Sequence, residues 1–168
     1  MVKDKTNRKA TGRSINGALA SRVQEVLGAH LARHGLRRSS VRDVVVTTFL
    51  AAPRHVSVDE LTGQVRERDE GIGHATVYRT LRLLTECGLA ERHDFGDGVT
   101  RYEPVRGTGH HDHLVCTGCG AIAEFENPEI DDLQQEVARS HRFVTETHKL
   151  ELYGRCAKCR SGRRGATP

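Results

Sequence analysis

The first half of the chain spaces its apolar residues with the period of an α-helix. Four stretches place apolar residues three or four positions apart, and each is bounded by Gly, Pro or Ser. We expect helices at residues 19–35, from 39 or 40 to 52, from a capping box at 57–60 through 65, and at 74–87.

Two short strands are expected next, at residues 89–95 and 99–103, joined by the hairpin signal Gly96-Asp-Gly98. Helices followed by a hairpin are typical of a winged helix-turn-helix, in which the helix before the hairpin enters the major groove of DNA. The exposed face of that helix carries polar side chains that can contact phosphates and base edges: His74, Thr76, Tyr78, Arg79 and Arg82. An amphipathic helix with an ordinary polar face is the alternative interpretation.

The second half has a mixed pattern that indicates a small α/β domain. A strand passes through residues 110–115 and a second lies at 121–125, a helix opens at Asn127-Pro128, and a last strand spans about 143–153. The predicted fold class is α+β. Its segments are a disordered basic arm (1–18), a winged-helix DNA-binding domain (19–102), a hinge linker (103–109), a metal-binding dimerisation domain (110–159) and a flexible tail (160–168).

The charge of the chain is uneven. Lys and Arg number 26 and Asp and Glu 22, a net charge of +4; residues 1–102 hold 17 and 12 of these, a net +5. A basic first half favours a nucleic-acid partner, although a solvated basic surface would have the same composition. The first twenty residues contain no apolar run, so we expect a cytoplasmic protein without a membrane partner.

Cysteines occur as two Cys-x-x-Cys pairs and one single residue. Cys116 with Cys119 and Cys156 with Cys159 can enclose Zn²⁺ in a closed tetrahedral site, which predicts a structural role. A redox pair or free thiols are the alternatives. The single residue, Cys87, is expected to be a small packed side chain.

A run of metal-binding residues, His110-His-Asp-His113, precedes the first cysteine pair. In an extended strand, His111 and His113 share one face while His110 and Asp112 share the other, so two metal sites can form on one strand. Such nitrogen and oxygen ligands suit Fe²⁺, Mn²⁺, Co²⁺ or Zn²⁺. A polyhistidine run without function and a metallohydrolase are the alternatives. Four other histidines are expected to be ordinary surface or hydrogen-bonded residues: His30, His34, His93 and His141.

Several of these motifs together resemble the ferric uptake regulator family. They are residues 73–79 (GHATVYR), 92–98 (RHDFGDG), 110–119 (HHDHLVCTGC) and 152–156 (LYGRC), and the likeness extends from about Leu36 to Cys159. The resemblance implies a metal-responsive repressor of iron-uptake genes that binds a palindromic DNA operator. The repressor would be a homodimer, with a tetramer as the alternative oligomeric state. The alternative is a protein with structural zinc that binds DNA constitutively, without regulation by a metal.

The resemblance also implies ligand sets for two further metals. A regulatory Fe²⁺, or Mn²⁺ or Zn²⁺ in its place, would bind a set drawn from both domains: His55, Glu103, His111, His113 and Glu124. An auxiliary site would consist of His110, Asp112, Asp131 and His148. Relatives that respond to peroxide tend to have Asp where this chain has Glu103, which favours an iron regulator; zinc-, manganese- and peroxide-responsive types remain alternatives.

For DNA, the resemblance implies Tyr78 and Arg79 in the major groove, Arg37 near the minor groove, and Arg42 with the basic arm on the backbone.

Overall fold

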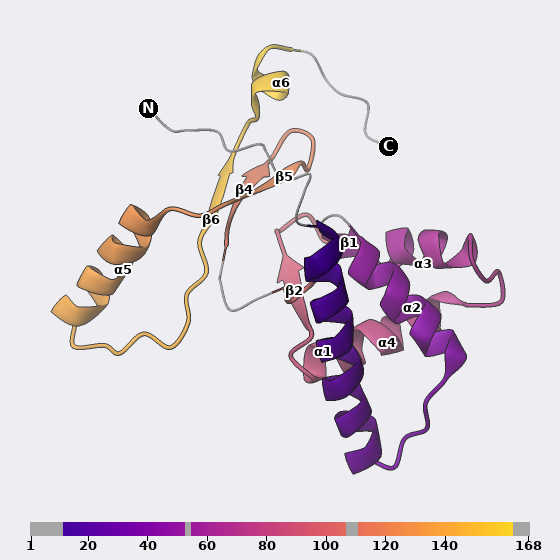
Figure 1. Cartoon of the computed structure of the whole chain (residues 1–168). Helices are drawn as coiled ribbons and strands as arrows, with labels where there is room; N and C mark the ends of the chain where they lie inside the picture. Colours follow the sequence, from indigo (N-terminus) through magenta and orange to yellow (C-terminus); the bar gives the residue numbers. More distant parts are fainter. Residues whose placement is uncertain (1–11, 53–54, 107–110, 163–168) are drawn as a thin grey trace. The chain divides into compact units, whose positions relative to one another are not determined.

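Twelve helices and strands make up the part of the chain that this computed structural model describes, residues 12–52, 55–106 and 111–162 (Figure 1). They separate into two units, residues 1–107 and 108–168. The first unit contains α1 (Gly12–Arg33), α2 (Ser40–Ala51), β1 (Val56–Ser57), α3 (Val58–Arg66), α4 (His74–Glu86), β2 (Ala90–Asp94) and β3 (Thr100–Pro104). The second contains β4 (Asp112–Cys116), β5 (Ile122–Phe125), α5 (Pro128–Ser140), β6 (Glu151–Gly154) and α6 (Ala157–Arg160). The α+β fold class is confirmed.

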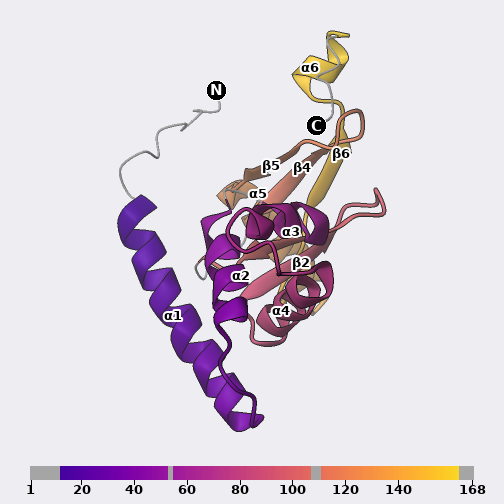
Figure 2. The ribbon, with the colours of Figure 1, turned by 90° about the vertical axis from the view of Figure 1, so that its right-hand side faces the viewer.

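The apolar stripes of the four helices in the first unit form its core. Eighteen buried residues make one cluster, to which α1 contributes through packing on α2 (Figure 2). Phe49, Leu61 and Leu81 from α2, α3 and α4 have no exposed surface. Cys87 packs partly buried against this cluster, as expected. The positions with helical spacing are therefore the ones that exclude water.

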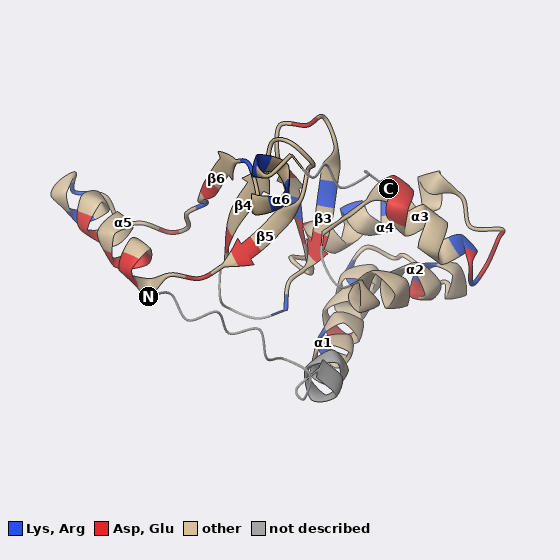
Figure 3. Cartoon of the chain, turned by 90° about the horizontal axis from the view of Figure 1, so that it is seen from above, with Lys and Arg blue, Asp and Glu red and all other residues tan. Residues whose placement is uncertain are grey.

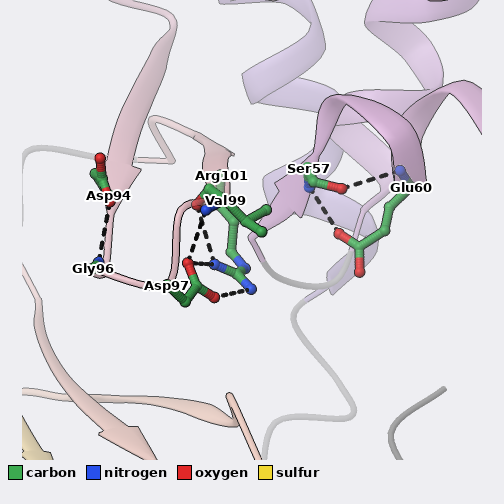
Figure 4. Close-up of polar contacts among 7 residues, drawn as sticks. All are labelled: Ser57, Glu60, Asp94, Gly96, Asp97, Val99 and Arg101. Atoms are coloured by element: carbon green, nitrogen blue, oxygen red, sulfur yellow. Dashed lines mark hydrogen bonds and ion pairs between the residues drawn. The ribbon is translucent and has the colours of Figure 1, made fainter. Parts of the chain in front are cut away.

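Local signals set the start of α3 and the turn of the hairpin (Figure 4). The Ser57 side chain accepts a hydrogen bond from the Glu60 backbone N–H at 3.1 Å, and the Glu60 carboxylate accepts one from the Ser57 N–H at 2.7 Å, which completes the predicted capping box. Between β2 and β3, Gly96 and Gly98 both have φ of +77°, a region that favours glycine.

A three-stranded sheet completes the first unit, with β3 between β1 and β2. Both neighbours are antiparallel to β3, and Tyr102 lies opposite Val56 on one side and Arg92 on the other. The two-residue strand β1 has no periodic pattern of its own and was not expected. It positions the residue that precedes it, His55, at the edge of β3.

The second unit is a small sheet with one longer helix. β4 is central, antiparallel to β5 and parallel to β6. Asn127 caps α5 by accepting the Glu129 N–H at 3.0 Å, and acidic residues occupy the first turn, where they oppose the positive end of the helix dipole (Figure 3). No residue of α5 is buried, and its Leu133 and Val137 are 61% and 60% exposed.

Four boundaries differ from the expectations. Residues 12–18, expected as part of the basic arm, are helical, because extending a helix that is already anchored costs far less than nucleating one; residues 1–11 lie outside the described part. Residues 103 and 104 belong to β3 and not to the linker. The last strand is only Glu151–Gly154, since the preceding segment exposes its apolar residues, and the short α6 was not expected. Among the described residues, no helix is long and apolar enough to cross a membrane.

Candidate metal centres

The two Cys-x-x-Cys pairs meet at one end of the second unit. Cys116 ends β4, Cys119 lies in the turn before β5, and Cys156 and Cys159 lie at the start and within α6. Their four sulfur atoms lie within 4.8 Å of one another, and the Cys119 and Cys156 sulfurs are 3.8 Å apart. Four thiolates around Zn²⁺ at about 2.3 Å would have their sulfurs about 3.8 Å apart, so the four cysteines fit a tetrahedral zinc ion.

The electrostatics of this cluster favour a cation. A hydrogen bond from the Cys156 N–H to the Cys116 sulfur at 3.3 Å, with further backbone donors, lowers the pKa of the Cys116 thiol to about 6. Hydrogen bonds with Cys119 and Cys156, together with the adjacent Cys116 sulfur, raise the pKa of Cys159 to about 12. The Cys116 thiolate therefore forms readily, while Cys159 resists ionisation partly because a second negative charge would be repelled by the first. A bound dication would offset this repulsion between thiolates.

A glycine brings the chain close to this sulfur cluster. A Cβ atom at Gly118 would lie 3.1 Å from the Cys159 sulfur, inside ordinary van der Waals contact. A larger residue at this position would have to displace the Cys159 side chain by a few tenths of an ångström.

The second candidate group lies in the first unit, at the edge of its sheet. His55 precedes β1 and reaches Glu103 of β3, with Nε2 3.3 Å from Oε2. His93 of β2 reaches the other oxygen of the same carboxylate, with Nε2 2.8 Å from Oε1. All three side chains are buried. The structure thus brings together two predicted regulatory ligands, His55 and Glu103, with a third residue that was not predicted.

His93 was expected to be an ordinary surface or hydrogen-bonded residue, and its position in the group was missed. The hairpin signal contained the information: with His93 opposite Arg101, the diagonal neighbour on β3 is Glu103. Alternation also places His93 on the same strand face as Phe95, whose ring stacks against it at 5.6 Å.

The remaining regulatory candidates lie in the second unit on one face of its sheet. The rings of His111 and His113 are 5.0 Å apart, and His113 pairs across strands with Glu124 of β5. One ligand atom of His111 lies within 4.8 Å of one of Glu124. On the other side of β4, His113 lies beside Glu151 of β6, a carboxylate that the sequence did not single out.

The opposite face of β4 carries the auxiliary group. His148 Nε2 is 3.9 Å from Asp112 Oδ1 and 3.7 Å from Asp131 Oδ1, so three of the four predicted residues meet. Asp112 is buried, while Asp131 and His148 are partly exposed. The fourth residue, His110, lies outside the described part of the chain. Two carboxylates and an imidazole at these distances suit a hard or borderline divalent cation.

The candidate DNA-contact residues surround the exposed face of α4. Tyr78 is 46% exposed and Arg79 is exposed beside it. A pocket of about 200 Å³ between the start of α2 and α4 is lined by Ser39, Arg42, Thr76, Arg79, Thr80 and Leu83. The Arg42 guanidinium donates to the Arg37 carbonyl at 3.0 Å, which holds it near this pocket. Two guanidinium groups, those of Arg42 in the first turn of α2 and Arg79 of α4, line this pocket, which therefore suits a phosphate group.

Comparisons with known proteins agree on one family. The model of the ferric uptake regulator family matches residues 33–153. The chain is 39% identical over 132 residues to the ferric uptake regulation protein of Rhizobium leguminosarum bv. viciae, covering 79% of this chain and 92% of that protein. Its fold is similar to the Helicobacter pylori ferric uptake regulator (TM-score 0.77, 28% identity, 86% and 93% of the two chains) and to a zinc-bound manganese uptake regulator (TM-score 0.62, 39% identity, 78% and 98%).

Proposed function

The chain belongs to the ferric uptake regulator family, and we propose that it represses iron-uptake genes as an Fe²⁺-loaded dimer on a palindromic DNA operator. The family is one of metal-responsive transcription regulators, so DNA and metal binding follow from membership, and catalysis forms no part of the proposed role. A repressor of this kind acts where the chromosome is, which in a bacterium is the cytoplasm.

The observation that carries the proposal is that each unit groups its own share of the regulatory ligands. In the first unit, His55 and Glu103 are 3.3 Å apart. In the second, His111 and His113 have rings 5.0 Å apart, and His113 lies opposite Glu124. We propose that one Fe²⁺ takes its ligands from both groups.

Such shared ligation would link metal binding to DNA binding. A cation that binds only when both ligand groups face it favours the domain arrangement that brings them together. That arrangement would set the spacing between the two α4 helices of a dimer, and with it the fit to two operator half-sites. The cation can shift the free-energy difference between the two arrangements only by as much as its own binding free energies for them differ.

On DNA, α4 is proposed to enter the major groove. Tyr78 and Arg79 would contact base edges, while Thr76 and Arg42, which line the pocket beside them, would hold a backbone phosphate. Arg37, exposed before α2, is proposed for the minor groove.

Zinc is proposed for the Cys116, Cys119, Cys156 and Cys159 cluster, where four thiolates leave no open coordination position for chemistry. Asp112, Asp131 and His148, with His110, are proposed as an auxiliary site that stabilises the second unit when it is filled. Neither site needs ligands from the first unit.

Dimerisation is proposed through the second unit. Its apolar side chains are exposed in the single chain: Leu133 and Val137 on α5, and Phe143 and Val144, which are 72% and 91% exposed, after it. A groove of about 500 Å³ lies between α5 and this following segment. A surface of this kind is typical of the contact between subunits of an obligate dimer.

Manganese is the strongest alternative for the regulatory metal. A manganese uptake regulator is 39% identical to this chain, and the nitrogen and oxygen ligands of the regulatory set suit Mn²⁺ as well as Fe²⁺. Zinc- and peroxide-responsive regulators share the same ligand types. The metal that activates DNA binding at its buffered cellular concentration decides between these types.

Replacing one regulatory ligand tests the proposed function. His111→Ala should abolish metal-activated operator binding while the dimer stays folded and keeps its zinc, with His34→Ala, an exposed histidine that belongs to no proposed site, as the control. Fluorescence anisotropy with a labelled operator measures the binding. Full metal activation of His111→Ala would contradict the shared regulatory site.

A further inference from the structure

One buried carboxylate in the first unit faces two imidazoles, and only one of these belongs to the proposed regulatory set. Glu103 presents Oε2 to His55 at 3.3 Å and Oε1 to His93 at 2.8 Å. The three side chains come from three separate segments: the residue before β1, strand β2 and strand β3. One ligand atom of each lies within 4.8 Å of the other two.

These separations match those of ligands around one cation. Imidazole nitrogen and carboxylate oxygen bind a transition metal at about 2.0–2.2 Å. Two such ligands at angles between 90° and 109° lie roughly 2.8–3.6 Å apart, a range that includes both distances to Glu103. Two histidines and one carboxylate are also the ligand set of many non-haem Fe²⁺ sites.

The surroundings of His93 fix its ring for this task. The Phe95 ring stacks parallel to it, with an angle of 6° between the planes and centroids 5.6 Å apart. The His55 ring meets it edge-on at 87° and 5.0 Å. Glu91, mostly exposed, has an oxygen 3.7 Å from His93 Nε2 and adds negative charge at the rim. A ring held in this way loses little conformational entropy when its nitrogen binds a metal.

We propose that His93 is a metal ligand, and that His55, His93 and Glu103 form a half-site that binds a divalent cation without any ligand from the second unit. The regulatory role of this half-site rests on the proposed function; His93 as its third ligand rests on the distances to Glu103. The DNA-binding unit would then capture the cation weakly, and ligands of the second unit would raise its affinity. His93 would set the concentration at which the regulator begins to respond.

The test uses the full chain with the ligands of the second unit removed and Co²⁺ as the probe. In zinc-loaded protein carrying His111→Ala, His113→Ala and His148→Ala, we expect one Co²⁺ per chain, with the visible absorption of nitrogen and oxygen coordination. Adding His93→Ala should weaken Co²⁺ binding at least roughly tenfold, the lower end of the effect of losing a supporting group at a metal site. Adding His34→Ala, an exposed histidine in the turn just after α1, should change nothing.

A second variant separates a ligand from a hydrogen-bond partner. His93→Gln can still donate to Glu103 but is a poor ligand for Co²⁺, so it should behave like His93→Ala. Retention of tight Co²⁺ binding by His93→Gln, or by His93→Ala with an unchanged melting temperature, would overturn the proposal. Metal-independent operator binding by the unaltered chain would instead refute the proposed function. The half-site would still be tested separately, by the Co²⁺ absorption of the variants with and without His93.

Discussion

Replacing Cys156 with Ser should unfold the second unit and leave the first unit folded. Within a single chain the second unit has little else to hold it: among its described residues, the only buried apolar side chains are Val115 and Cys116. Burying one such aliphatic side chain contributes about 1.5–3 kcal/mol. A structural zinc ion contributes on the order of 10 kcal/mol, so the loss of zinc outweighs the remaining core.

Hydrogen exchange resolved by peptide, with zinc content measured in parallel, checks this prediction. In Cys156→Ser, protection should vanish from β4, β5 and β6, because their sheet closes on the cysteine cluster, while α2, α3 and α4 keep theirs through the eighteen-residue core. Cys87→Ser is the matched control, because Cys87 lies in the first unit at the end of α4. This variant should keep its full zinc content. A Cys156→Ser protein with unchanged protection in β4–β6 would refute the structural role of the cluster.

Three further predictions follow from particular contacts. Val137→Glu should convert the dimer to monomers in analytical ultracentrifugation, because it places a charge on the apolar surface of α5; an intact dimer would exclude that surface. Gly118→Ala should speed zinc extraction by a chelator, since its Cβ would lie 3.1 Å from the Cys159 sulfur, and an unchanged rate would show that the turn relaxes. The hydrogen bond and ion pair with Arg101 lower the pKa of Asp97, so their contribution is present above the unfolded pKa of about 3.9 and is lost as the pH falls. Asp97→Asn should therefore destabilise the first unit by at most about 1 kcal/mol at pH 7, because the pair is partly exposed, and by nothing near pH 2; an equal loss at both values in thermal denaturation would contradict this.

Local signals in the sequence predicted the first unit well. The capping box at Ser57 and Glu60 and the glycines of the hairpin each determine a backbone conformation within a few residues. Such signals can therefore be interpreted without knowledge of the tertiary fold. The apolar residues of α4 that have helical spacing, Val77, Leu81 and Leu84, are all buried. Helical period and turn chemistry were sufficient for these elements.

The second unit was less predictable because little of it is buried. The last strand was expected from about residue 143, but Phe143 and Val144 are exposed and β6 begins at Glu151. Their apolar character fits a surface between subunits, and periodicity in one chain cannot distinguish that surface from a core. The spacing of the cysteines did identify their cluster, since ligand chemistry restricts the arrangement more than packing does.

The group around Glu103 shows the limit most clearly. His55 and Glu103 entered as candidates through a family resemblance, and His93 did not enter at all. Their proximity arises from the register of three strands, in which β1 is only two residues long. A contact that depends on such register involves residues distant in sequence and leaves no local pattern.

The central claim, that metal binding and operator binding are linked, is tested most directly by measuring the linkage in both directions. Fe²⁺ titrated anaerobically into chelator-treated, zinc-loaded protein should raise the affinity for a palindromic operator, and saturating operator should raise the affinity for Fe²⁺ by the same factor. That factor is expected to be at least fivefold, the lower end of about 5–150 for allosteric coupling. Operator affinity that is the same with and without Fe²⁺, Mn²⁺ or Zn²⁺ would contradict the account.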